Sequence, residues 1–136
     1  MTLPVTAMTA AILALLIIYL SIQVVRQRLR TGTAFGAGSD PQMDMVRGCH
    51  SNLIEYSPIA LLMLALLELS SANHLALMSL AASFLFARFL HVLGMHQHLA
   101  GKTIRFRQLA ILLTWLVIAI LAVWIIYLGV TLNLLR

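Results

Sequence analysis

Four long apolar stretches separated by short polar segments organise this sequence. The first, residues 4–25, contains no charged residue. At roughly 1.5 Å per residue it is long enough to cross about 30 Å of hydrocarbon. The other three are expected at about residues 45–69, 74–95 and 106–132. The pattern predicts an all-α integral membrane protein, a single domain over residues 1–136 built as a bundle of four transmembrane helices.

The connections between these stretches are polar and short. Residues 31–42 are rich in Gly, Ser and Thr and predict a loop. Residues 70–73 allow only a tight turn, so the second and third helices are expected to be antiparallel neighbours, with Asn73 as the N-cap of the third. Residues 96–102 predict a third, polar loop.

Composition supports the membrane assignment and narrows the class of partner. The chain is 62% hydrophobic and 10% charged, whereas soluble domains are about half apolar and a quarter charged. A net charge of +5 would suit nucleic acid, but the basic residues flank the apolar stretches as membrane-edge charges do. No nucleic-acid role is predicted. No Lys or Arg precedes the first apolar stretch, so we expect a retained helix rather than a cleaved signal peptide.

Charge asymmetry predicts the orientation. Only Arg136 lies at a terminus, and the turn at residues 70–73 carries no Lys or Arg. The first and third loops with their flanks carry Arg26, Arg28, Arg30, Lys102, Arg105 and Arg107. The positive-inside rule therefore places these two loops in the cytoplasm and both termini outside.

A polar segment opens the second apolar stretch: residues 47–58 read Arg-Gly-Cys-His-Ser-Asn-Leu-Ile-Glu-Tyr-Ser-Pro. On a helix, Asn52, Glu55 and Tyr56 share one face because they are three and four residues apart. A carboxylate inside a membrane costs roughly 2.5–3.5 kcal/mol and needs a partner. Counted from the cytoplasmic helix ends, Glu55 and Arg88 reach similar depths, so an ion pair between them is expected.

Two interpretations of this cluster stay open. In one, Glu55 and Arg88 only lock two helices together, and Asn52 adds a hydrogen bond. In the other, the surplus of polar residues forms a pocket open to the cytoplasm that suits a small ligand with carboxylates. The additional residues of that pocket would be His50, His91 and the rim residues Arg28, Arg30 and Arg105. The histidines lack the Cys or carboxylate partners of a tetrahedral site, so no metal site is predicted.

The segment from His50 to Pro58 resembles the second-helix signature of the MAPEG superfamily (membrane-associated proteins in eicosanoid and glutathione metabolism). The resemblance continues in residues 21–28, Ser-Ile-Gln-Val-Val-Arg-Gln-Arg, and 88–94, Arg-Phe-Leu-His-Val-Leu-Gly. It implies a left-handed four-helix bundle assembled as a homotrimer. It also implies glutathione bound between neighbouring subunits at the cytoplasmic side, and a place in a bacterial inner membrane.

The resemblance assigns roles to individual residues. The residues implied in glutathione binding are Arg28, Arg47, His50, Asn52, Glu55, Tyr56, Arg88 and His91. Arg105 is near the position of the Arg that lies beside the glutathione sulfur in catalytic members, and Arg30 is the second candidate for that role. Two positions depart from the pattern: Gly48 stands where the family usually has Arg, and Met95 replaces a common Tyr. Arg47 can replace the missing Arg only if the helix starts late or irregularly, because one residue turns a side chain by about 100°.

The function implied is a glutathione-dependent transferase or peroxidase with glutathione as co-substrate. Its second substrate would be a lipophilic electrophile arriving from the lipid. Two alternatives stay open. The chain could be a non-catalytic lipid- or glutathione-binding protein of the same fold. It could also be a small proton-coupled exporter, although such carriers usually place their membrane Glu in the first helix, where this chain has none.

Overall fold

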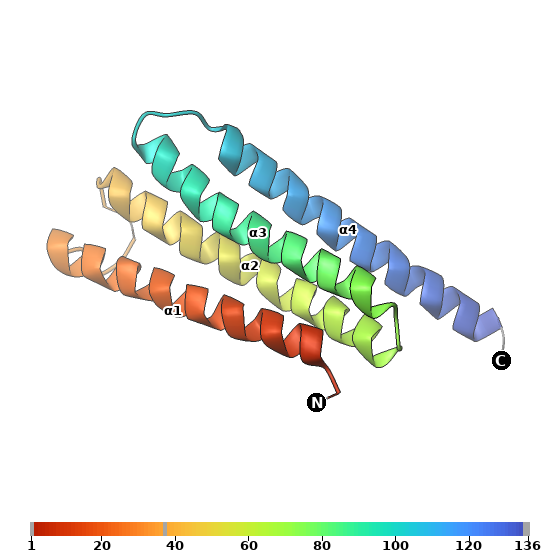
Figure 1. Ribbon diagram of the computed structural model, residues 1–136. Coiled ribbons are helices and arrows are strands. Elements are labelled where there is room, and N and C mark those ends of the chain that lie inside the picture. Colours follow the sequence, from red (N-terminus) through yellow and green to blue (C-terminus); the bar gives the residue numbers. More distant parts are fainter. Residues whose placement is uncertain (1, 37, 135–136) are drawn as a thin grey trace.

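The computed structural model contains four long α-helices lying side by side in an elongated bundle (Figure 1). Helix α1 spans Pro4–Thr31, α2 Pro41–Leu69, α3 His74–Leu99 and α4 Arg105–Leu134. The structure describes residues 2–36 and 38–134, with side chains up to Thr131, so Arg136 lies outside the described residues. All four helices are long and apolar enough to span a membrane. The predicted all-α membrane protein with four spanning helices is confirmed.

The helix ends show where local chemistry extends the apolar pattern. Helix α2 begins at Pro41, ahead of the expected residue 45, because proline fits the first helical turn and Asp40 caps it by accepting from the Gln42 backbone N at 3.1 Å. The Asn73 Oδ1 accepts from the Ala76 backbone N at 3.0 Å, which confirms the predicted N-cap of α3. Polar residues thus continue helices that the apolar pattern alone ends too early.

Helices α2 and α3 form the middle of the bundle. Helix α1 packs against both of them, and so does α4, but α1 and α4 do not contact each other in the part of the chain that the structure describes. The connections α1–α2 and α3–α4 lie at one end of the bundle, which we call the basic end. The α2–α3 turn lies at the other, which we call the opposite end (Figure 1).

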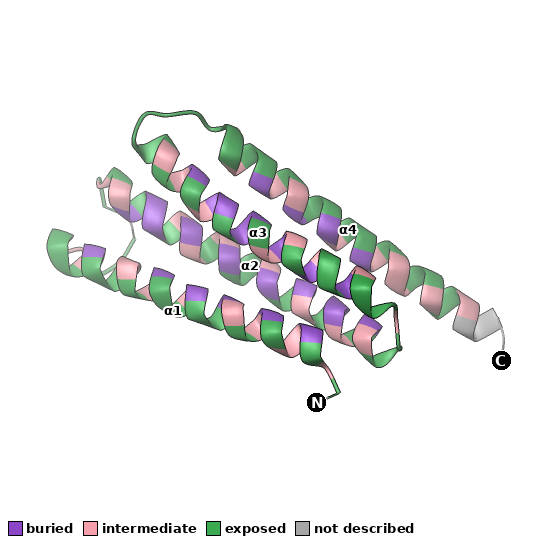
Figure 2. Cartoon of the chain, viewed as in Figure 1, coloured by how far each residue is buried: buried purple, intermediate pink, exposed green. Residues whose placement is uncertain are grey.

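Small residues bring the helices together. In lipid, helices associate through close packing and hydrogen bonds rather than through hydrophobic burial. Ala60, Ala87 and Ala110 are fully buried between helices. At Gly94 the approach is closest, because a Cβ atom there would lie 2.5 Å from the Arg107 backbone N of α4. Buried residues accordingly line the inner faces of the helices, and the exposed ones face outward, where lipid would meet them (Figure 2).

Buried hydroxyl groups are satisfied within their own helices. Thr9, Ser57 and Thr114 each donate to the carbonyl oxygen four residues earlier, at 2.6–2.7 Å. An unsatisfied polar group in a membrane interior would cost several kcal/mol. These side chains therefore pack at helix interfaces without a penalty.

Candidate functional site

Arg88 lies at the centre of the polar cluster and connects three helices. From α3 its Nη1 donates to the Asn52 Oδ1 of α2 at 2.7 Å and to the Asn52 carbonyl oxygen at 3.4 Å, and its Nη2 donates to the Thr114 hydroxyl of α4. Its guanidinium carbon is 5.4 Å from the ring centroids of both Tyr56 and Phe84, a distance at which aromatic faces attract a cation. The side chain is only 2% exposed. Its Nε has no hydrogen-bond partner among the described residues.

The expected ion pair between Glu55 and Arg88 is wrong. The two residues were matched by depth, but depth says nothing about the direction in which a side chain leaves its helix. Asn52 faces α3 and takes the guanidinium, whereas Glu55 is exposed on the outside of α2. Within the described residues Glu55 has neither a hydrogen bond nor an ion pair.

The hydroxyl group of Tyr56 is hydrogen-bonded to helix α4. The Trp115 Nε1 of α4 donates to the Tyr56 hydroxyl oxygen at 3.1 Å. Tyr56 therefore joins Asn52 and Arg88 in one connected group that spans α2, α3 and α4. Glu55, between Asn52 and Tyr56 in the sequence, lies beside this group and faces outward.

The two candidate histidines have different surroundings. His50 is half-buried, and its Nε2 lies 2.9 Å from the Ser21 hydroxyl of α1, so it joins α1 to α2. His91 follows Arg88 by one turn and is 4% exposed inside the bundle. Ligand contacts by either residue stay predictions, and for His91 a contact requires access to the interior.

The rim arginines gather at the basic end but are not equivalent. Arg28 Nη1 donates to the carbonyl oxygens of Thr33 and Ala34, at 3.2 and 2.7 Å, so it supports the first loop. Arg30 is exposed, with one long contact of 3.4 Å to Gln42. Arg47 and Arg105 are exposed as well. Their predicted roles, glutathione binding for Arg28 and Arg47 and thiolate stabilisation for Arg30 and Arg105, stay predictions.

The Met95 side chain of α3 occupies the space beside Gly48 of α2. A Cβ atom on Gly48 would lie 3.0 Å from the Met95 Cε of α3. Helix α2 is α-helical from Pro41 onward, so it starts early and runs regularly through this position. The condition under which Arg47 would take over the place of position 48 is therefore not met, and a contact of the exposed Arg47 with a ligand would have to be made from its own position.

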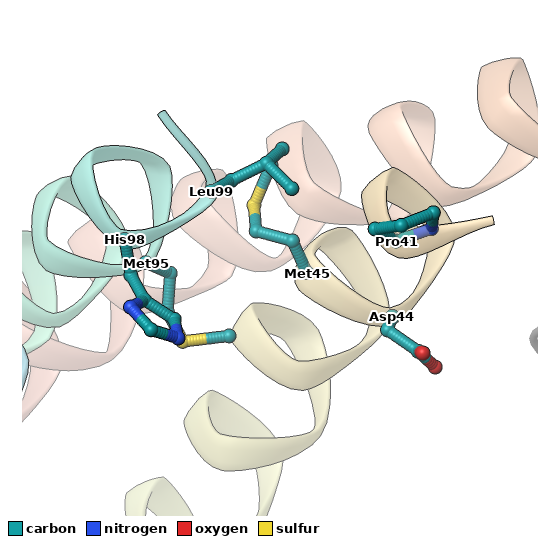
Figure 3. Close-up of a pocket in the computed structure, with 6 residues that line it drawn as sticks. All are labelled: Pro41, Asp44, Met45, Met95, His98 and Leu99. Atoms are coloured by element: carbon teal, nitrogen blue, oxygen red, sulfur yellow. The ribbon is translucent and has the colours of Figure 1, made fainter. Parts of the chain in front are cut away.

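A cavity of about 330 Å³ opens between α2 and α3 at the basic end, close to Gly48 (Figure 3). Figure 3 shows Met45 directed toward Leu99, whereas the Asp44 carboxylate points away from α3. The residues that line the cavity are Pro41, Asp44, Met45, Met95, His98 and Leu99. None of the predicted glutathione-binding residues lines this cavity, so we do not assign the site to it.

Sequence reasoning missed four residues that the structure connects to these groups. Thr114 accepts a hydrogen bond from Arg88. Arg107 is half-buried, its backbone lies against Gly94, and its Nε has no partner among the described residues. Gln27, at the basic end of α1, donates to the Asp40 carboxylate. Glu68 caps α1 from the opposite end. In a single sequence, a hydroxyl within an apolar run, such as Thr114, or a second arginine near the first, such as Arg107, gives no signal that would separate these residues from their neighbours.

Glu68 supplies the cap that α1 lacks. Leu3 occupies the N-cap position and offers no side-chain hydrogen bond. The Glu68 carboxylate of α2 instead accepts from the backbone N atoms of Val5 and Thr6, at 2.8 and 2.9 Å, and from the Thr6 hydroxyl at 2.7 Å. A carboxylate at a helix N-terminus is favourable both as a hydrogen-bond acceptor and as a negative charge.

Asp40 makes the corresponding contact in the first loop, at the basic end. The hydrogen bond from the Gln27 side chain is the largest influence that lowers the pKa of Asp40 below its usual value, with backbone donation from Gln42 and the charge of Arg30 acting in the same direction. The α1–α2 pair is therefore fastened by one carboxylate at each end. Among the described residues, no group of three or more His, Cys, Asp or Glu side chains is placed to hold a metal ion.

The fold and this cluster define a class: four-helix integral membrane proteins with a polar group of Asn, Glu, Tyr and Arg on the inner helices. The model of the MAPEG family matches residues 6–127. The chain belongs to the MAPEG family. It is 30% identical over 111 residues to the inner membrane protein YecN of Escherichia coli strain K12, covering 82% of each chain. The same figures hold for YecN of Escherichia coli O6:H1. The protein is an integral membrane protein like this relative, whose name gives a location and no activity.

Proposed function

We propose that this protein is a glutathione-dependent transferase or peroxidase that acts on lipophilic electrophiles. The observation that carries the proposal is the outward-facing Glu55, beside an Asn52 and a Tyr56 that are each held by a hydrogen bond. An intramembrane carboxylate facing lipid would cost roughly 2.5–3.5 kcal/mol on insertion scales. It becomes favourable when a polar ligand and a second copy of the chain cover it.

The proposal includes a homotrimer with glutathione between subunits, as the family resemblance implies. Exposed Arg47 and Arg105 at the basic end give carboxylates of such a ligand partners, since guanidinium groups bind carboxylates through two parallel hydrogen bonds. Apolar substrate would reach the same face from the lipid. Proximity of the two reactants would then account for much of the rate enhancement.

The chemical task is to form a thiolate. An ordinary thiol has a pKa near 8.5, and lowering it by two units requires about 2.7 kcal/mol of differential stabilisation. Arg105 and Arg30 are the two arginines first proposed for this. Arg107 joins them as a third candidate, because it is half-buried at the start of α4 and its Nε is unpaired among the described residues.

The test is glutathione binding to the detergent-purified protein, with thiolate absorbance followed on mixing. We expect saturable binding and a thiolate signal, both strongly reduced in Glu55→Gln. Alanine variants of the three arginines should separate their roles, the thiol-activating one losing the thiolate signal and retaining binding. If all three kept full conjugation rates, the enzymatic assignment would be wrong.

A non-catalytic binding protein of the same fold is the second candidate. The observation that favours it is Gly48, which packs against Met95 and leaves no side chain at a position where the family usually has Arg. This candidate predicts saturable glutathione or lipid binding without thiolate and without turnover of any electrophile. The absorbance experiment distinguishes it from the enzyme directly.

A further inference from the structure

Two side chains of the proposed ligand-binding face have one polar atom already occupied from inside the bundle. Asn52 accepts from Arg88 through Oδ1 at 2.7 Å, and Tyr56 accepts from Trp115 through its hydroxyl oxygen at 3.1 Å. Guanidinium and indole N–H groups can only donate. The direction of both hydrogen bonds is therefore fixed by chemistry and does not depend on how the amide or the hydroxyl is oriented.

We propose that Arg88 and Trp115 are positioning residues that fix the donor and acceptor polarity of this face. With Oδ1 occupied, Asn52 offers its amide N–H groups. With its oxygen accepting from Trp115, Tyr56 offers its hydroxyl hydrogen. A bound molecule that presents hydrogen-bond acceptors, such as a carboxylate or a carbonyl, to Asn52 and Tyr56 matches these free donors.

Glu55 supplies the opposite polarity on the same surface. It is exposed beside the two donors, and an ionised carboxylate only accepts hydrogen bonds. The face on which Arg88 and Trp115 act therefore combines fixed donors with one fixed acceptor. This inference rests on the proposed function, since it specifies the chemistry of the same site.

Burial keeps Arg88 from direct ligand contact, and the hydrogen bond to Tyr56 uses the only N–H group of Trp115. Arg88 is only 2% exposed and reaches Asn52 from the interior, through α3. Trp115 is about half exposed, but its one N–H is engaged by Tyr56. Without these bonds a free amide can turn over and a free hydroxyl can rotate, and binding would have to order them again. Preorganisation is what Arg88 and Trp115 contribute.

A double-mutant cycle of Trp115→Phe and Tyr56→Phe tests the Trp115 part through the glutathione dissociation constant. Loss of one hydrogen bond corresponds to roughly a three- to tenfold change. We expect Trp115→Phe to weaken binding by about that factor when Tyr56 is present, and to change nothing in the Tyr56→Phe background. Trp124→Phe, on the same helix, is the matched control and should bind as the unmodified protein does. An equal loss in both backgrounds, or no loss in either, overturns the proposal.

Asn52→Asp tests the Arg88 part. The aspartate keeps an acceptor for Arg88, so the fold should melt at the same temperature or higher, but it shows oxygen where the amide showed N–H. We expect glutathione affinity to fall by about tenfold or more, and further than in Asn52→Ala. Retained affinity in Asn52→Asp would mean that the amide donor plays no part.

A readout without ligand keeps this inference separate from the proposed function. The chain has two tryptophans, so indole-¹⁵N labelling gives two N–H resonances. Tyr56→Phe should shift the Trp115 resonance and leave that of Trp124 in place. An unmoved Trp115 resonance overturns the positioning by Trp115 whatever binds. A protein that binds no glutathione at millimolar concentration refutes the proposed function, and the resonance shift still decides the positioning.

Discussion

Two carboxylates on the same helix have opposite surroundings. Glu68, near the opposite end of α2, accepts three hydrogen bonds from the first turn of α1. Glu55, further toward the basic end, is exposed and has no partner among the described residues. Both are Glu in a membrane-type helix, and composition does not distinguish them.

The difference separates structural from functional polarity. A saturated carboxylate has its acceptor capacity used by the protein itself, so its removal should affect stability. An unsaturated one can offer that capacity to a ligand or to a second subunit. The same contrast holds for arginine, since Arg88 is engaged by two helices and Arg105 is exposed. The open polar groups collect at the basic half of the bundle.

The largest effect is expected for Glu55→Gln. A hydrogen bond to a charged group is worth about 1.5–3 kcal/mol, so we expect glutathione affinity to fall roughly ten- to hundredfold. The melting temperature in detergent should change little, because Glu55 makes no contact within its own chain. Isothermal titration calorimetry and a thermal melt measure both. A large drop in melting temperature with unchanged affinity would reverse the contrast with Glu68.

Gly94→Ala should disturb the basic half of the bundle by displacing the backbone of α3 or α4. The new Cβ would lie 2.5 Å from the Arg107 backbone N, and backbone has to move to admit it. We expect a loss of about 1–3 kcal/mol of stability, as for other overpacked sites, together with weaker glutathione binding as the first turn of α4 shifts. Gly129→Ala is the matched control, because nothing lies within 4 Å of its added Cβ. The control should be neutral or slightly more stable.

Glu68→Gln tests the carboxylate that is already hydrogen-bonded within the protein. It keeps the shape but weakens a cap whose loss typically costs about 1 kcal/mol. The expected result is a lower melting temperature with an unchanged glutathione dissociation constant. Thr6→Val, which removes only the hydroxyl donor to the same carboxylate, should give a smaller decrease. A loss of binding in Glu68→Gln would show that the opposite end also takes part in the site.

The smallest effect concerns pH and Asp40. Because its pKa is lowered in the folded protein, chiefly by Gln27, this carboxylate stabilises the fold above its unfolded value near 3.9. That contribution disappears as the pH falls through the folded value. Thermal melts between about pH 5 and pH 3 should show a larger decrease for the unmodified protein than for Gln27→Met. Parallel curves for the two would refute this role of Gln27.

The sequence predicted the elements better than the contacts. Apolar runs gave four helices, and Asn73 was confirmed as a cap because its signal is local. The Glu55–Arg88 pair failed because residue counting gives the depth of a side chain along a helix and not its direction around it. The actual partner of Arg88 is Asn52, which lies one turn before Glu55 on α2. Asn52 turns toward α3 and Glu55 lies on the outside of α2, so the face they were expected to share is divided between the bundle interior and its outer surface.

Contacts between residues far apart in the sequence could not be predicted. The link from Glu68 to Val5 and Thr6 joins residues more than 60 positions apart, and no local pattern announces it. Thr114 looks like any hydroxyl in an apolar helix, where it bonds to its own backbone. Its second role, as acceptor for Arg88, depends on how α3 and α4 pack. Arg107 was overlooked in favour of Arg105 for the same reason.

The early start of α2 has a consequence for the environment of the site. Its 29 residues correspond to roughly 43 Å of helix, which matches a bilayer including its headgroups, at about 40–45 Å, rather than the hydrocarbon alone. In a bilayer of that thickness the arginines of the basic end would lie at the level of the lipid phosphates, which are anions like a ligand carboxylate. Anionic lipid headgroups would then compete with glutathione for the same guanidinium groups. The apparent affinity for glutathione would therefore depend on the lipid composition of the membrane.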